Sequence, residues 1–337
     1  MSRRQFLKKV SLAGGLVGLG SLSQHTGIVS ADYWISLPII NNGTTAPFPG
    51  ELNPNPPGQT QRLVFIHHST GQNWLADGNG NLGLALKAAN YFVSDTNYGW
   101  GPNGIGNNTD IGNWYDWFLG PDHGTYLPAL FAETDQHCSY SRLPSNPGGE
   151  NSIIMFKPCF PNSAVYGSPN DPPTLGANPI NSQGAGSATY TVDNIKALYL
   201  SLLNYFATRQ DKLFVIILAP PLVQDATNAT QAANARAVNT WLVNNLLSSY
   251  IYKNVAIFDF YNVLTSNGGS PTINDAGATT GNHHRYRNNA IDYITNQGSN
   301  YSMYGSGDSH PTPAGGQKAS AEFVVLLNIA YHRWKTS

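Results

Sequence analysis

The chain has 337 residues, with 18 Lys and Arg against 19 Asp and Glu, and a formal net charge of −1. Charged residues make up 11% of the sequence and hydrophobic residues 41%, with 34 glycines and 22 prolines. This composition excludes a disordered chain and a coiled coil, and the near-neutral charge argues against nucleic-acid binding, which needs a positive surface.

The N-terminus has the form of an export signal. Arg3 and Arg4 precede an apolar run over residues 10–22, and small residues lead to Ala31. This pattern predicts a twin-arginine signal peptide, residues 1–31; a short anchoring helix is the alternative, although the run is shorter than the ~20 residues that span a bilayer. We therefore expect a secreted or cell-envelope protein, exported folded by the twin-arginine machinery and free of the membrane after cleavage.

Residues 32–61 are rich in Pro, Asn, Gly and Thr. They predict a mobile tether, because such a segment buries too little apolar area to offset the entropy lost on ordering. The remaining residues, 62–337, contain no internal repeat and are expected to form one domain.

Short apolar runs alternate with helical patterns along this domain. The sequence predicts strands at 62–66, 91–93, 152–156, 213–218 and 255–258, and helices at 82–91, 193–208, 228–247 and 313–334. Because the strands are apolar throughout and helices separate them, we expect a parallel sheet with helices on both faces, a three-layer αβα sandwich.

The sequence holds two cysteines, Cys138 and Cys159. Cys159 follows the third predicted strand and Cys138 lies in the segment before it, so a short return of the chain would bring them together. An oxidising destination permits a disulfide, and a pair of buried thiols fits the sequence equally well. Their spacing matches no zinc-binding pattern.

Polar residues follow the carboxyl ends of the predicted strands, where open parallel sheets bind their ligands. Ser69 lies in the turn after the first strand, and Asn162 lies in a Pro-flanked turn after the third. Asp308 and His310 stand just before the last helix. These residue types suit a hydrolytic site. Ser69 could be a nucleophile, Asn162 an amide donor to an oxyanion, and His310 a base held by the Asp308 carboxylate. Helix capping by Ser69 and turn formation by Asn162 are the alternatives.

This order of residues resembles the SGNH/GDSL hydrolases. His67-His68-Ser69 stands in place of the family's Gly-Asp-Ser, Phe160-Pro161-Asn162-Ser163 in place of Gly-x-Asn-Asp, and Asp308-Ser309-His310 in place of Asp-x-x-His. The resemblance covers about residues 62–334 and implies a flavodoxin-like parallel sheet of about five strands.

The resemblance also implies roles for individual residues. Ser69 would attack an ester carbonyl, His310 would take its proton, and Asp308, or the backbone in its place, would orient the imidazole. Besides the Ser69 amide, the oxyanion donors would be Asn162 and a glycine after the second strand, Gly99 or Gly101. No cofactor is implied.

Aromatic residues cluster near these positions in the sequence. Trp74, Trp100 and Trp114, together with His68, are candidates for a substrate-binding wall that stacks on sugar rings; core packing is the alternative. The resulting hypothesis is an exported serine esterase acting on a small-molecule or glycan ester, for example an acyl group on a glycan.

Two other functions fit the same sequence. The first is a metal-dependent hydrolase that draws its ligands from a pool of histidines and carboxylates. The pool consists of His67, His68, His283, His284, His310, Asp110 and Asp308. The second is a catalytically inert surface protein that binds glycan on the same fold, because a fold alone does not establish a function.

Overall fold

The computed structural model describes residues 52–295 and 299–336. The expected signal peptide, residues 1–31, and residues 32–51 of the expected tether lie outside the described residues. Among the helices in the described ranges, none combines the length and the hydropathy needed to cross a membrane.

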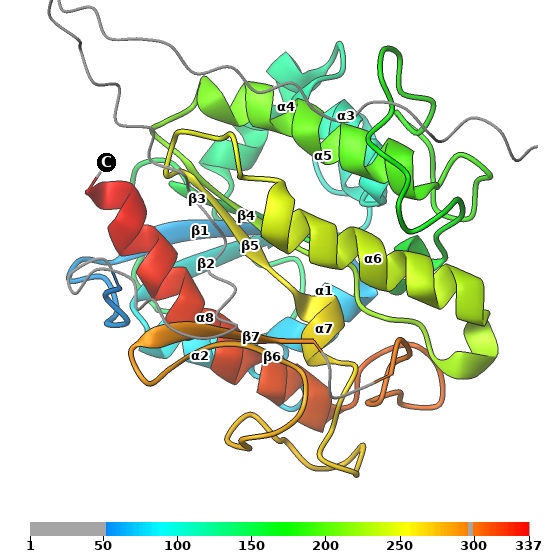
Figure 1. Cartoon of the computed structure of the whole chain (residues 1–337). Coiled ribbons are helices and arrows are strands. Elements are labelled where there is room, and N and C mark those ends of the chain that lie inside the picture. The colour runs from blue at the N-terminus through cyan, green and yellow to red at the C-terminus, as the bar shows by residue number, and fades with distance from the viewer. Residues whose placement is uncertain (1–51, 296–298, 337) are drawn as a thin grey trace, which may run out of the picture. The chain divides into compact units, whose positions relative to one another are not determined.

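Five parallel strands form one sheet in the order β2-β1-β3-β4-β5 (Figure 1). They are β1 (Gln61–Ile66), β2 (Tyr91–Thr96), β3 (Ile153–Phe156), β4 (Leu213–Ile217) and β5 (Val255–Phe258). This strand order is that of doubly wound, flavodoxin-like sheets. The expected three-layer sandwich around a five-stranded parallel sheet is confirmed.

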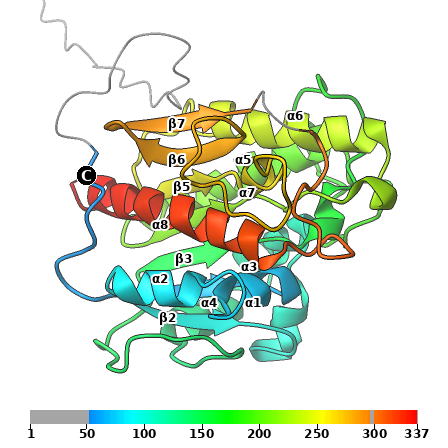
Figure 2. The same ribbon diagram turned by 90° about the horizontal axis from the view of Figure 1, so that it is seen from below.

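Helices cover both faces of the sheet (Figures 1 and 2). One face carries α1 (Ser69–Leu75), α2 (Leu82–Ala88) and α8 (Pro313–Lys335), and the other carries α3 (Trp114–Phe118), α4 (His123–Ala132), α5 (Val192–Ala207) and α6 (Ala229–Asn245). The short elements are α7 (Phe260–Val263), η1 (Pro102–Asn107), η2 (Ile111–Asn113), η3 (Phe160–Ser163) and η4 (Gln224–Ala226).

Two hydrophobic cores lie between the sheet and these helical layers. Successive side chains of a strand point to opposite faces, so Leu63 and Phe65 of β1 enter the core beneath α1, α2 and α8. Val64 and Ile66 enter the opposite core, beneath α3, α5 and α6. The buried strands thereby hold the turns after their carboxyl ends at one edge of the sheet.

A two-stranded antiparallel hairpin, β6 (His283–Arg287) and β7 (Ala290–Ile294), lies beside the main sheet. It packs on α8, which separates it from α1 and α2 (Figure 2). The Glu322 carboxylate of α8 accepts the backbone N–H of His284 at 2.8 Å and bonds the His283 ring. The sequence did not predict this hairpin, because β6, His-His-Arg-Tyr-Arg, lacks the apolar pattern of the five other strands.

The last residues of the expected tether pack against the domain. Asn328 of α8 donates to the carbonyl of Pro54 at 2.9 Å, and His332 bonds the carbonyl of Asn55 at 3.0 Å. Asn90 donates to the carbonyl of Pro57 at 2.9 Å. The tether therefore meets the domain at residues 54–57, whose carbonyls accept these hydrogen bonds, and the expected mobility of the segment stays a prediction.

Candidate active site

The turn after β1 presents Ser69 as the first residue of α1. His68 occupies the N-cap position, and no side chain caps the helix, so the structure does not support the alternative in which Ser69 is a cap. A Cβ on Gly71 would lie 2.3 Å from the Cβ of His67. A glycine at position 71 therefore allows α1 to start directly against the end of the strand.

Ser69, His310 and Asp308 form a connected triad. The Nε2 of His310 lies 2.9 Å from the Oγ of Ser69, and its Nδ1 lies 3.0 Å from Oδ2 of Asp308. A proton on Nδ1 satisfies the carboxylate and leaves Nε2 free to accept from the serine hydroxyl. This is the arrangement of a nucleophile, its base and the acid that orients the base.

The shortened Asp-x-His spacing still lets the carboxylate reach the imidazole. The backbone N–H of His310 donates to Oδ1 of Asp308 at 2.8 Å, which bends the loop so that both side chains lie together. This hydrogen bond, with that from the imidazole, holds the pKa of Asp308 below its ordinary value. The Asp308 side chain is 61% exposed and that of His310 23%, so this edge is open to solvent.

Asn162 has other partners than the expected oxyanion. Its amide nitrogen donates to Oδ1 of Asp110 at 2.7 Å and to the carbonyl of Cys159 at 3.1 Å. Its Oδ1 accepts the backbone N–H of Ile111 at 2.8 Å, and the side chain is buried. One amide hydrogen therefore joins η3 to the loop before η2, and the other bonds the residue before η3, so the expected donor role is not met in this arrangement.

The two candidate glycines lie in the loop after β2, and both have positive φ angles, +74° for Gly99 and +75° for Gly101. The N–H of Gly99 donates to Oδ1 of Asn107 at 2.8 Å. For the N–H of Gly101, the described part of the chain shows no acceptor. Of the two glycines, Gly101 is therefore the one whose backbone N–H is available to donate to a ligand.

His68 secures this glycine loop to the start of α1. Its ring stacks on Tyr98, with centroids 3.9 Å apart, and its Nε2 bonds the carbonyl of Gly106 at 2.6 Å. Burial lowers the pKa of His68, which favours the neutral ring. The buried His68 is therefore a support for the loop, whereas Tyr98, 60% exposed, presents the aromatic surface.

The expected aromatic wall is wrong. Trp74, Trp100 and Trp114 are only 1%, 8% and 0% exposed. Trp74 lies in the core beneath α8, and Trp100 and Trp114 lie in the opposite core. The core-packing alternative holds because each indole buries a large apolar area.

Comparisons with known proteins add little to this geometry. No protein-family model matches the chain, and no curated protein matches it. A chain from one crystal structure aligns over 80% of this chain and 96% of its own length, at 14% identity and a TM-score of 0.34. A likeness of that degree carries no argument about function.

Sequence reasoning did not place a cysteine beside the serine. The Sγ of Cys159 lies 3.7 Å from the Oγ of Ser69 and 2.9 Å from the Oγ1 of Thr70. Both cysteines are free thiols, so the disulfide alternative is wrong. The available signal was topological: Cys159 follows β3, which neighbours β1, so the two turns meet at one sheet edge.

Lys157 is a second residue that the sequence analysis missed. It follows β3, is fully buried, and donates from Nζ to the carbonyl of Pro158 at 2.9 Å. Burial lowers the pKa of Lys157 to about 8. The loss of solvation on burial disfavours the charged ammonium close to the site, although it lies over the Phe260 ring, 5.9 Å from the ring centroid.

The expected pool of metal ligands is divided among separate places. His310 pairs with Asp308, His283 pairs with Glu322, and His284 accepts the backbone N–H of Asp259. His68 bonds a carbonyl, and Asp110 bonds Asn162. Only His67 of the pool joins a candidate metal-ligating group among the described residues, and its partners are two side chains outside the pool.

Proposed function

We propose that the protein is a serine hydrolase acting on esters, with a mechanism of the SGNH/GDSL type. The observation that carries the proposal is the hydrogen bond from Ser69 to His310, 2.9 Å long, with Asp308 on the other imidazole nitrogen. The serine lies at the carboxyl edge of a parallel sheet, on the turn into α1, where a substrate can approach the hydroxyl.

The triad would act in two steps. Ser69 attacks the ester carbonyl as Nε2 of His310 takes its proton, and the imidazolium then protonates the departing alcohol, which leaves an acyl-serine. Water attacks this acyl-serine with His310 again as base, and the acid is released. Asp308 stabilises the imidazolium that forms in both steps.

The oxyanion would be held by backbone donors. The N–H groups of Ser69 and Gly101 lack acceptors among the described residues, and donors of this kind stabilise a developing negative charge. Gly101 is preferred over Gly99, whose N–H is bonded to Asn107. Asn162 would contribute only if its bond to Asp110 or to Cys159 were exchanged for one to the substrate.

The site favours an ester that is presented at a surface. Tyr98 is exposed beside the His68 support, and the Phe160 ring lies edge-on to His310 with centroids 4.9 Å apart. These two rings would flank an acyl group or a sugar, which makes an acylated glycan the preferred substrate. The export signal expected from the sequence would place the enzyme at the cell envelope or beyond it.

Hydrolysis of simple and glycan esters tests the proposal. The wild-type protein should release acid from short-chain aryl esters or from acetylated polysaccharide, and Ser69→Ala should reduce the rate by several orders of magnitude. Thr70→Val is the matched control, because it alters the neighbouring hydroxyl and leaves the nucleophile. A Ser69→Ala protein that retains full activity would contradict the proposal, and polysaccharide binding without hydrolysis would favour a glycan-binding protein.

A further inference from the structure

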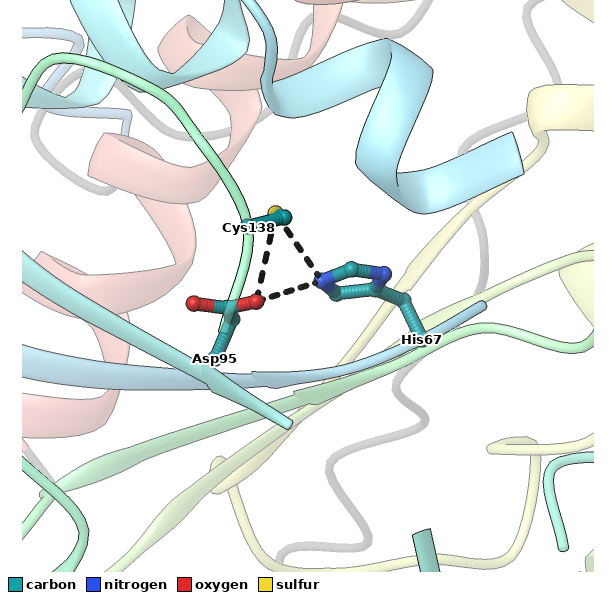
Figure 3. A group of neighbouring side chains, drawn as sticks. All are labelled: His67, Asp95 and Cys138. Carbon is teal, nitrogen blue, oxygen red and sulfur yellow. Dashed lines mark hydrogen bonds and ion pairs between the residues drawn. The ribbon is translucent and has the colours of Figure 1, made fainter. Parts of the chain in front are cut away.

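Three potential metal ligands from three segments meet beneath the Ser69 turn. His67 follows β1, Asp95 belongs to β2, and Cys138 lies in the loop between α4 and β3 (Figure 3). The Nε2 of His67 lies 3.0 Å from Oδ2 of Asp95, and the Sγ of Cys138 lies 3.2 Å from Oδ2 and 3.9 Å from Nε2. All three atoms face a common point.

These separations match the ligand edges of a tetrahedral zinc site. Bond lengths of about 2.0–2.1 Å to nitrogen, 2.0–2.2 Å to oxygen and 2.3 Å to sulfur give ligand–ligand distances of roughly 3.3–3.6 Å. The three observed distances, 3.0, 3.2 and 3.9 Å, differ from these by a few tenths of an ångström. Side-chain rotations alone can supply that difference.

Neighbouring groups hydrogen-bond the ligand side chains in the way that is typical of metal sites. Nδ1 of His67 lies 2.9 Å from the carbonyl oxygen of His68, an acceptor for a proton on that nitrogen. The other carboxylate oxygen of Asp95, Oδ1, accepts from the Tyr140 hydroxyl at 2.9 Å and from the backbone N–H of His137 at 2.8 Å. Such outer partners fix the tautomer of a ligating histidine and leave one oxygen of the carboxylate for the metal.

Burial strengthens the case for a cation at this point. Nε2 of His67 lies 3.0 Å from Oδ2 of Asp95, and both side chains are fully buried. A cation held between them would therefore feel the carboxylate with little screening by solvent. The nearby sulfur of Cys138 is a third ligand suited to such a cation.

We propose that His67, Asp95 and Cys138 bind a zinc ion. Imidazole, thiolate and carboxylate together suit a borderline-soft divalent cation, and a water completes the tetrahedron. On binding, the S–H bond of Cys138 breaks, its proton passes to solvent and a Zn–S bond forms, with no change of oxidation state. The ion would fasten the loop after α4 to the ends of β1 and β2, two residues before Ser69.

Zinc titration of the reduced, full-length protein tests this proposal independently of any hydrolase activity. We expect one zinc per chain in the wild type. Cys138→Ser should weaken binding ~100-fold or more, and Tyr140→Phe, which releases Asp95, by ~10–100-fold. Cys159→Ser is the matched control, because Cys159 lies outside the three-residue group, and it should bind zinc as the wild type does.

Alkylation of the wild type gives a second measurement that needs no variant to fold. Zinc should protect Cys138 from iodoacetamide and leave Cys159 reactive, as peptide mapping would show. A wild type that binds no zinc after equilibration with the ion would overturn the proposal. Equal affinity in the wild type and in a folded Cys138→Ser variant, or equal labelling of Cys138 with and without zinc, would overturn it as well.

Discussion

The Nε2 of His310 lies 2.9 Å from the Oγ of Ser69, although the two residues are 241 positions apart in the chain. Ser69 begins α1, and His310 stands three residues before α8. The two helices are joined within one core, where the Trp74 ring packs on Phe323 and its indole N–H donates to Ser320 at 2.9 Å. The hydrogen bond of the site therefore depends on the packing of α1 against α8.

Replacing Asp308 by Asn should reduce turnover less than replacing His310. The carboxylate bonds the imidazole but is 61% exposed, so water can take over part of its role, and we expect a loss well below the ~10⁴-fold typical of a buried triad acid. Steady-state rates on one ester measure this. The control is Asp122→Asn, which changes an exposed acid before α4. If Asp308→Asn lost as much turnover as His310→Ala, water would not compensate for the missing carboxylate.

Asn162→Ala should lower stability, because the Asn162 side chain joins two loops through its hydrogen bonds with Asp110 and Ile111. Its removal leaves the buried Ile111 N–H without its acceptor, at a cost of about 1–3 kcal/mol. Denaturant unfolding measures this. If unfolding is unchanged while kcat falls by ~10²–10³ with KM constant, Asn162 is instead an oxyanion donor, as the family resemblance implies.

Lys157 should make stability depend on pH in the alkaline range. Burial lowers the pKa of Lys157 to about 8, against about 10.4 in the unfolded chain. The unfolded state thus binds more protons between these values, and stability rises with pH through that window. Lys157→Met should stabilise the protein at pH 7 by up to about 3 kcal/mol, an advantage that shrinks above pH 8. A constant difference between the two proteins from pH 7 to pH 10 would contradict this.

Alkylation of Cys159 should block the site without direct chemistry at the serine. Its sulfur lies 3.7 Å from the Oγ of Ser69, so an added group would occupy the space that a substrate carbonyl needs. We expect iodoacetamide to reduce wild-type activity strongly, and Cys159→Ser to be active and resistant. Equal inhibition of both proteins would place the sensitive thiol elsewhere.

The sequence predicted the layers of the fold because strong apolar patterns determine them. The helix expected at 193–208 is Val192–Ala207, and the strand expected at 255–258 is Val255–Phe258. The β6–β7 hairpin was missed, since β6 is polar and is held by contacts with residues distant in the chain, among them Glu322 of α8.

The triad was predictable because each member follows from its place relative to a strand or helix. Ser69 follows β1 and His310 precedes α8. The functional candidates that failed depended on side-chain direction, which the sequence does not specify: Trp74 and Trp114 point into the cores. Cys138 and Cys159 were taken as a possible pair, whereas the topology brings each to a different partner, Asp95 and Thr70.

Labelling with a fluorophosphonate, followed by peptide mapping, tests the central claim most directly, because the reagent reports an activated serine without a choice of substrate. We expect one modified residue, Ser69, no labelling of Ser69→Ala, and labelling of His310→Ala slowed by orders of magnitude. Thr70→Val should label as the wild type does. A folded wild-type protein that stays unlabelled at Ser69, or that reacts equally fast without His310, would contradict the assignment of a serine hydrolase.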